Sequence, residues 1–181
     1  MDFYELVKHR QSTRAFVPDA PVDRDVLNRI LEAGRLSPSA CNAQPWHFVV
    51  VDEPELKNKV ADATSSRVLG MNHFTKQAPV HILMVEEQVN ISSGIGGIVK
   101  DKHFAFLDMG IAAAHICLAA ESEGLGTCII GWFSENKVKE LLHIPKNKRV
   151  VLDIILGHPA QPLREKKRKP ADEVISYNTY K

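Results

Sequence analysis

The sequence has little cysteine: three residues in 181, Cys41, Cys117 and Cys128, with no CxxC pair among them. An odd number without paired spacing argues against a disulfide framework and a cysteine metal site, and favours reduced thiols in the cytoplasm. A secretory signal is also missing, because the N-terminus MDFYELVKHR has no apolar core behind basic residues. The longest apolar run, around GIAAAHICLAA, is short and has polar flanks, so no membrane span is expected.

An excess of charge is absent too. Lysine and arginine total 23 against 22 aspartates and glutamates, a net charge of +1, which gives no reason to expect nucleic acid or membrane partners. The distribution is uneven, because residues 164–169, REKKRK, carry a local charge of +4. With 44% hydrophobic and 25% charged residues, the composition predicts one globular domain over residues 1–181.

Familiar catalytic signatures are missing as well. There is no Ser-His-Asp elbow, zinc signature or convincing pair of carboxylates, so we expect no metal and assign no catalytic side chain. If the protein is an enzyme, a cofactor supplies the chemistry. The glycine-rich stretch GIGGI, near residues 94–97, lacks the lysine of a phosphate loop and does not fit GxGxxG. We interpret it as part of a flap over residues 88–103.

Helical periodicity and capping residues predict alternating helices and strands. The helices are expected at 2–9, 23–36 with Asp23 as N-cap, 53–62, 103–123 and 134–143, and the strands within WHFVVVDE, PVHILMVEE, TCIIGWF and RVVLDIILGHP. Helix 103–123 is apolar on nearly every face and is expected to be central. The alternation favours an α/β or α+β sandwich around one mixed sheet, followed by an extended arm over residues 160–181.

The stretch HRQSTRAF gathers two arginines and two hydroxyls close to the N-terminus. On a helix, Arg10 and Arg14 would lie about one turn apart and point the same way. Arginine and hydroxyl donors match phosphate oxygens, which suggests an anion site. The alternative is a solvated basic turn whose charge is balanced by Asp2 and Glu5.

A second polar stretch, SPSACNAQPW, follows the helix expected at 23–36. Serines 37 and 39 with Asn42 and Gln44 offer hydroxyls and amides suited to the edge of a heterocycle or sugar. The alternative is a turn that caps the helix end, for which these residue types are common.

Three further groups have both a structural and a functional interpretation. Asp108 and His115 lie seven residues apart on the long helix, either as a proton relay or, as we favour, as a polar stripe. Cys117 and Cys128 are expected to be small core residues. Trp46 and Trp132 each border a strand, where an aromatic ring packs in the core or covers a flat ligand.

Four motifs, in order and spacing, resemble the FMN-dependent nitroreductase family. They are RQSTRAF, SPSACNAQPWHFVVV, DMGIAAAHICLAAESEGLGTCIIGWF, and LGHP followed by the basic arm. The resemblance covers nearly the whole chain and is closest to the shorter members. It implies an α+β fold with a mixed central β-sheet flanked by helices, and an intertwined homodimer with one FMN in each of two interface pockets.

The resemblance also implies site residues. Arg10, Gln11, Ser12 and Arg14 would bind the phosphate and ribityl chain of FMN, and Arg168 would complete the phosphate site. Pro38, Ser39, Ala40 and Asn42, with Gln44 nearby, would reach the flavin of the other subunit. The main chain at Ile130 and Gly131 would face flavin N5, and Asn72 falls near a pyrimidine-ring contact of some members.

The implied activity is hydride transfer from NADH or NADPH to the flavin and then to a nitroaromatic, quinone or similar acceptor, with ping-pong kinetics. No nucleotide-binding motif separate from the flavin site distinguishes NADH from NADPH. Three alternatives stay open: an FMN-binding carrier or sensor with little turnover, a flavin- or azoline-modifying relative on the same scaffold, and an interaction protein without FMN.

Overall fold

Four strands form one sheet, in the order β1-β2-β4-β3. The structure is a computed structural model that describes residues 1–18, 20–66, 69–87 and 103–180; the glycine-rich stretch interpreted as a flap lies outside these residues. The strands are β1 (Trp46–Val51), β2 (Val80–Glu86), β3 (Gly126–Ile130) and β4 (Arg149–Gly157). All four predicted strands are therefore present, and the α+β class is confirmed.

Strand direction differs from the expected mixed sheet. The pairs β1–β2, β2–β4 and β3–β4 are all antiparallel. A parallel contact occurs outside the named strands, as an isolated bridge between Ser12 and Thr127. An alternation of helices and strands does not determine strand direction, because a connecting segment can return the chain to either end of the sheet.

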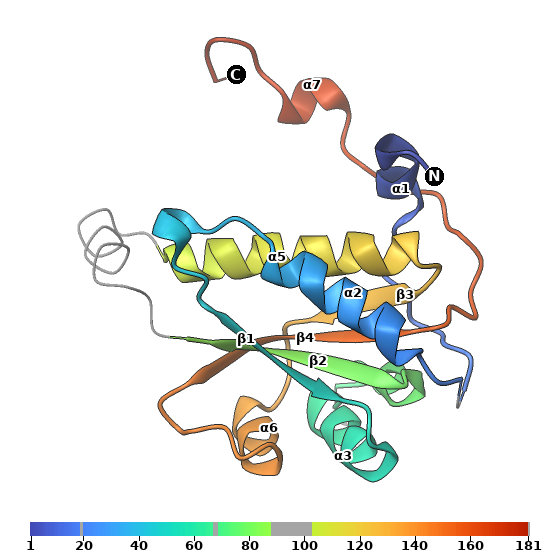
Figure 1. Cartoon of the computed structure of the whole chain (residues 1–181). Coiled ribbons are helices and arrows are strands. Elements are labelled where there is room, and N and C mark those ends of the chain that lie inside the picture. The colour runs from blue at the N-terminus through green and yellow to red at the C-terminus, as the bar shows by residue number, and fades with distance from the viewer. Residues whose placement is uncertain (19, 67–68, 88–102, 181) are drawn as a thin grey trace.

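Helices cover both faces of the sheet, and this explains the apolar strands. Helices α2 (Arg24–Arg35) and α5 (Phe104–Ser122) lie on one face, and α3 (Pro54–Thr64) and α6 (Glu135–Leu141) lie on the other (Figure 1). Side chains of β2 alternate between the two cores: Ile82 and Met84 pack with α2 and α5, whereas Leu83 and Val85 pack with α3 and α6. A strand covered on both faces is apolar at nearly every position.

Capping and close packing position α2. The carboxylate of Asp23 accepts hydrogen bonds from the amides of Asp25 and Val26, which confirms it as the N-cap. At Gly34 the helix approaches α5 so closely that an added Cβ would lie 2.7 Å from Cγ1 of Ile116. Glycine is required there by this contact.

Helix α5 is buried on one side only. Met109, Ala112 and Ile116 are fully buried, whereas Phe106, Leu107 and Ile111 are exposed. With 19 residues, α5 is long and apolar enough to cross a membrane by length and composition, so the expectation that this run is too short was wrong. Its packing against α2 and the sheet is that of a core helix.

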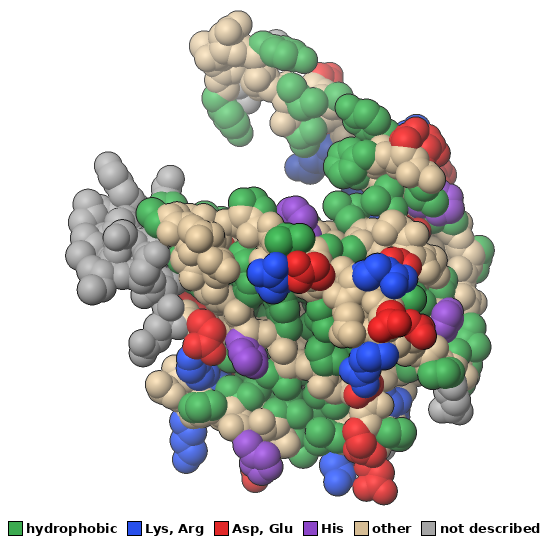
Figure 2. Space-filling view, in the orientation of Figure 1, with side chains coloured by type: hydrophobic (Ala, Val, Ile, Leu, Met, Phe, Trp, Pro, Cys, Tyr) green, Lys and Arg blue, Asp and Glu red, His purple; other side chains and the backbone are tan. Residues whose placement is uncertain are grey.

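Both ends of the described chain project from the body (Figure 1). Helix α1 (Phe3–His9), with Asp2 as N-cap, has no buried residue. Beyond residue 168 the arm is exposed and includes the short helix α7 (Ala171–Val174). Figure 2 shows hydrophobic side chains along this projecting segment. Tyr177 and Tyr180 in this part of the chain are exposed. Such exposed apolar segments are typical of surfaces that pack against another chain.

Candidate functional site

The segment after α1 runs along the edge of the sheet beside β3. Helix α1 ends at His9, so Arg10 and Arg14 do not share a helical turn as expected. Instead, the amide of Thr13 donates to the carbonyl of Thr127 at 2.8 Å, and Thr13 is buried. Alternate residues of an extended segment share a face, so Arg10, Ser12 and Arg14 lie on the side opposite Thr13.

The close approach of this segment depends on a glycine in β3. A Cβ added at Gly126 would lie 2.5 Å from Oγ1 of Thr13. Any larger residue at position 126 would therefore push the segment away from the sheet.

The basic arm runs back along the same segment. The amide of Ala160 donates to the carbonyl of Ala15, and the side chain of Gln161 accepts from the amide of Arg14. Gln11 binds the arm twice: Nε2 donates to the carbonyl of Pro162, and Oε1 accepts from the amide of Arg164. The side chain of Gln11 therefore holds the arm in place, whereas the resemblance implied a cofactor contact.

Positive charge concentrates where the arm passes α1. Burial lowers the pKa of the half-buried Lys166 ammonium, and the charges of Arg10 and Arg168 lower it further, while Glu121 opposes the shift. Lys166 donates a hydrogen bond to the carbonyl of Lys8. Within the described ranges, neither arginine nor Lys166 forms an ion pair with a carboxylate. We call Arg10, Lys166 and Arg168 the cation cluster; a set of clustered cations without a counter-ion is suited to bind an anion.

Lys166 was not among the site residues predicted from the sequence, where Arg168 was the one residue chosen from the basic arm. The acidic residues upstream do not form ion pairs with Arg10 or Arg14, because Asp2 caps α1 and Glu5 pairs with Lys8. The signal that singles out Lys166 is its contact with the chain near Arg10, and this contact joins residues 158 positions apart.

Toward its other end, the N-terminal segment reaches the short helix η2 (His73–Gln77). The guanidinium of Arg14 lies 6.0 Å from the ring centre of Phe74, in cation–π geometry. Residue Asn72 precedes η2 in the left-handed conformation, with φ +60°. Its Nδ2 donates to the carbonyls of Thr64 and Trp132, each at 3.1 Å. The side-chain NH₂ is thus bound by the chain, and only Oδ1 faces a possible ligand.

Strand β3 ends beside this asparagine, at the residues expected near flavin N5. Ile130 is buried and pairs with Asp153, whereas Gly131 and Trp132 are exposed. A Cβ added at Gly131 would meet only the Leu152 side chain, at an ordinary 3.8 Å, and the backbone has no left-handed φ there. The protein itself therefore does not require glycine at position 131.

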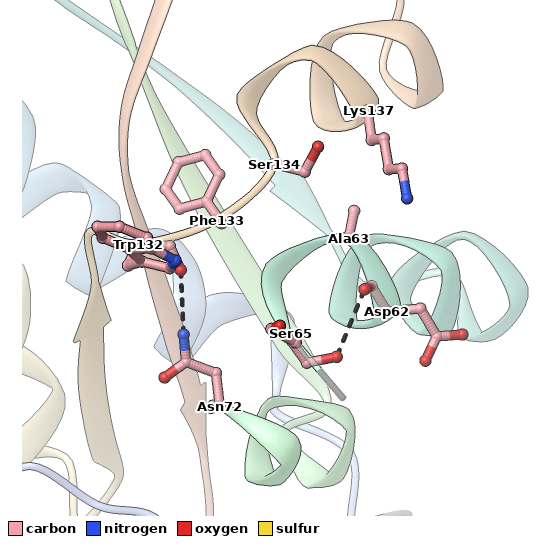
Figure 3. A pocket seen from close by; sticks show the side chains of 9 residues that line it. Asp62, Ala63, Ser65, Asn72, Trp132, Phe133, Ser134 and Lys137 are labelled. Atoms are coloured by element: carbon pink, nitrogen blue, oxygen red, sulfur yellow. Dashed lines mark hydrogen bonds between the residues drawn. The ribbon is translucent and has the colours of Figure 1, made fainter. Parts of the chain in front are cut away.

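A cavity of about 380 Å³ lies next to Trp132 (Figure 3). It separates the end of α3 from the turn between β3 and α6, and Asn72 bonds to Trp132 across one side of it. The side chains that line it are mostly small or polar: Asp62, Ala63, Ser65, Ser66, Asn72, Trp132, Phe133, Ser134 and Lys137.

The second polar stretch forms a tight loop around the short helix η1 (Ala40–Asn42). Cys41, Asn42 and Gln44 all have φ near +50°, a strained conformation for residues other than glycine. Ser39 Oγ accepts from the amide of Gln44, which closes the loop internally. Strain of this kind clusters at ligand-binding sites, in agreement with the ligand interpretation of Ser39, Asn42 and Gln44, and with the exposed Pro38 beside them.

Asp108 anchors this loop to α5. Both of its carboxylate oxygens accept the amide hydrogen of Ala40, at 3.1 Å. His115 is exposed, and its ring nitrogen bonds to the carbonyl of Ile111. The two residues do not form a proton relay, because seven helical residues separate them by about 10 Å along the axis. The favoured interpretation, in which both are polar residues that bond to nearby backbone, describes them better: Asp108 binds the amide of Ala40, and His115 binds the carbonyl of Ile111.

The two groups of site residues lie at opposite ends of α5. The loop contacts Asp108 near the helix start, whereas His9, beside Arg10, lies 3.6 Å from Glu121 near its end. Thirteen helical residues span about 20 Å. One chain therefore brings Arg168 near Arg10, and Ser12 and Arg14 follow Arg10 along the same segment, whereas residues 38–44 lie at the other end of α5.

The cysteines, the tryptophans and possible metal ligands among the described residues are candidates for a second site. Burial raises the pKa of the Cys117 and Cys128 thiols, and both are core residues as expected. Trp46 packs in the core and stacks on Phe48, whereas Trp132 is exposed at the strand end. In the part of the chain that the structure describes, no cluster of three His, Cys, Asp or Glu residues can hold a metal ion.

Fold and site together define an α+β protein with a cluster of cations where the C-terminal arm passes α1 and a strained polar loop elsewhere. The chain belongs to the nitroreductase family, whose family model matches residues 7–158. It is 31% identical to the FMN reductase [NAD(P)H] of Bacillus subtilis, over 97% of this chain and 72% of that protein.

Solved structures agree with this assignment. A nitroreductase family protein from Clostridium novyi NT is 36% identical, with a TM-score of 0.75 over 88% of this chain and 86% of that one. The NADPH:FMN oxidoreductase from Vibrio harveyi, complexed with NAD⁺, is 27% identical with a TM-score of 0.79 over 98% of this chain and 77% of that one. The resemblance found in the sequence is thus confirmed.

Proposed function

We propose that this chain is an FMN-dependent oxidoreductase that oxidises NADH or NADPH and reduces nitroaromatics, quinones or similar acceptors. The observation that carries the proposal is the cation cluster, which forms no ion pair with a carboxylate among the described residues and contacts the N-terminal segment. A phosphate ester with a charge near −2 would neutralise it through charge-assisted hydrogen bonds. The names of the relatives, an FMN reductase and an NADPH:FMN oxidoreductase, support the same cofactor.

The chain's own residues fit FMN at both ends of the N-terminal segment that runs beside β3. Arg10, Lys166 and Arg168 would hold the phosphate, with Ser12 and Arg14 along the ribityl chain. At the far end, the exposed main chain of Gly131 leaves room that a side chain would fill. When bound, FMN supplies the hydride chemistry. The protein binds it, orients it and donates main-chain hydrogen bonds near Ile130 and Gly131.

A homodimer with shared sites completes the proposal. Asp108, which holds the 38–44 loop, and Glu121, which lies beside His9, are about 20 Å apart along α5, so we assign this loop to the FMN of the other subunit. The exposed apolar face of α5, with Phe106, Leu107 and Ile111, provides a surface on which a second copy would bury them. Ser39, Ala40, Asn42 and Gln44 would then reach the flavin of the other subunit. The buried thiols Cys117 and Cys128 fit a cytoplasmic location.

The test is a reconstitution followed by reduction. The purified chain is stripped of flavin, loaded with FMN, and mixed anaerobically with NADH or NADPH while flavin absorbance is followed. Rapid bleaching, then reoxidation by a nitroaromatic or quinone, is expected. A flavin that stays yellow would identify a carrier or sensor, and a chain that takes up no FMN would contradict the proposal. Sedimentation of the loaded sample should give a dimer with two FMN.

A further inference from the structure

A buried polar pair joins the two central strands. His81 in β2 and Asp153 in β4 are both 0% exposed, and Nδ1 of His81 lies 2.8 Å from Oδ2 of Asp153. On its other side, Nε2 of His81 lies 3.2 Å from the carbonyl oxygen of Thr75. A carbonyl oxygen only accepts, so Nε2 carries a hydrogen and donates it to Thr75.

Burying this polar pair costs desolvation free energy. The second carboxylate oxygen of Asp153, Oδ1, is buried without a hydrogen-bond partner among the described residues. Buried charged pairs are often no more stable than apolar residues of the same size. A half-satisfied pair of this kind therefore indicates a role in orientation more than in stability.

One side of the pair leads to Trp132. His81 binds the carbonyl of Thr75, a residue of η2. The amide and hydroxyl of Thr75 both donate to the carbonyl of Asn72, at 3.0 and 2.9 Å. The side chain of Asn72 then donates to the carbonyl of Trp132 (Figure 3). His81 is thus linked to Trp132 through two intervening residues, Thr75 and Asn72.

The other side leads to Ile130. The main chain of Asp153 pairs with Ile130, the last pair between β4 and β3. Gly131 therefore lies between two residues that the pair holds, Ile130 through Asp153 and Trp132 through His81. Gly131 itself has little packing, because a Cβ there would contact only one side chain. A glycine without packing is the most mobile point of such a turn unless both neighbours are held.

We infer that His81 and Asp153 are a positioning pair, which sets the main chain at residues 130–132 against the flavin ring. This inference rests on the proposed function, since the flavin-facing role of Ile130 and Gly131 belongs to it. The pair touches neither flavin nor substrate. It holds both neighbours of Gly131, so that the amide beside the ring keeps one direction before FMN binds.

The decisive variant removes both polar groups. His81→Phe/Asp153→Leu keeps the core filled, whereas His81→Phe alone leaves a buried carboxylate unpaired and fails to fold well. Asp153→Asn is the conservative variant, because its amide can donate to Nδ1 of His81. Thr64→Val is the matched control: it removes a buried hydroxyl of α3 that bonds to Ala61 and approaches the Thr75 hydroxyl, but it leaves the carbonyl that binds Asn72.

Two measurements are made on every variant. In the FMN-free chain, amide hydrogen exchange of residues 130–134 is expected to rise about tenfold in the double variant, the effect of one net hydrogen bond. In the FMN-loaded chain, the flavin spectrum shifts and reduction by NAD(P)H slows by about the same factor, with little change in FMN affinity because the cation cluster is intact. Asp153→Asn and Thr64→Val are expected to behave like the parent.

Two results overturn the inference: exchange that stays at the parent's rate in the double variant, or faster exchange with an unchanged flavin spectrum and reduction rate. These differ from failure of the proposed function, in which the parent itself binds no FMN or is not reduced. The exchange measurement needs no flavin, so it tests the link between the pair and residues 130–132 in either case.

Discussion

The main-chain amide of Ala40 points at the carboxylate of Asp108 and lies 3.1 Å from both of its oxygens. This contact explains why an acidic side chain is buried in an apolar helix. We expect Asp108→Ala to lower the free energy of unfolding by about 1–3 kcal/mol, because the amide loses a charged acceptor. Asp108→Asn, which keeps one acceptor, should cost less.

Urea unfolding and an FMN titration of both variants test this anchor. FMN binding should weaken as the loop around η1 loosens. His115→Ala is the control, since that ring bonds only to its own helix in the described chain. Equal losses of turnover in Asp108→Asn and His115→Ala, with FMN binding unchanged, would instead support a proton relay.

Removing a charge of the cation cluster should weaken FMN binding without unfolding the protein. For Arg10→Ala we expect a loss of about 1.5–3 kcal/mol, or roughly ten- to a hundredfold in affinity, as for one charge-assisted contact. Lys166→Ala should behave similarly, and Arg168→Ala should have a smaller effect while Lys166 remains. Fluorescence titration of the FMN-free chain measures this. Arg24→Ala, which breaks a surface ion pair with Asp52, is the control. An Arg10→Ala variant that binds FMN as tightly as the parent would remove Arg10 from the site.

A charge on the exposed face of α5 should separate the subunits. Obligate interfaces typically bury about 2,000 Å² or more, so the parent should stay dimeric at micromolar concentration. Ile111→Glu places an unpaired carboxylate in that interface and should give monomers without FMN in sedimentation. Leu69→Glu, at another exposed apolar residue outside α5, should leave the dimer intact.

Asn42→Ala provides the complementary observation. It should loosen FMN but keep the dimer, because an amide contact to a ligand adds little to a large apolar interface. A monomeric parent that retains one FMN per chain would contradict the shared-site proposal.

Two glycines at the edge of the sheet should respond oppositely to alanine. Gly126→Ala forces a Cβ against Thr13 and should destabilise the fold by about 1–3 kcal/mol through overpacking. Gly131→Ala meets no close contact in the protein, so its thermal midpoint should match the parent's. Its FMN binding or reduction rate should nevertheless fall, since the added methyl occupies space beside the main chain that faces the ring. Unchanged flavin behaviour in Gly131→Ala would place the ring elsewhere.

Stability should depend on pH through Glu135. Burial raises the pKa of this carboxyl, but hydrogen bonds from Arg149, Lys139 and the amide of Val150 outweigh it and lower the pKa to about 2. The ionised group therefore stabilises the fold above its ordinary value of 4.5, and this is lost as the pH falls from 4.5 to about 2. Allowing for screening, Glu135→Gln should cost about 1–2 kcal/mol at pH 7 and progressively less below pH 4.5.

Urea unfolding of parent and Glu135→Gln at pH 7 and pH 3 measures the difference. Glu140→Gln, an exposed carboxylate of the same helix, is the control. A difference that is the same at both pH values would mean that the glutamine disturbs packing and that the charge of Glu135 contributes little.

Local pattern was sufficient for the positions of the elements. Apolar runs located all four strands within a few residues, and Asp23 marked a helix start because capping depends on residues one to three positions away. The order of four motifs identified the family. Arg10 and Arg14 also stood out as candidates for an anion site, which stays a prediction, although they follow the helix that ends at His9 and do not share a helical turn.

Contacts between distant parts of the chain decided the rest. The strands run antiparallel, Lys166 donates to the carbonyl of Lys8, Asp108 holds Ala40, and His81 pairs with Asp153, over sequence separations from 68 to 158 residues in the three side-chain contacts. A buried polar side chain needs a partner to offset its desolvation, and the partner's place in the sequence depends on how the strands and the arm are arranged. Periodicity reports which face of an element is apolar, but it carries no information on which polar group lies opposite.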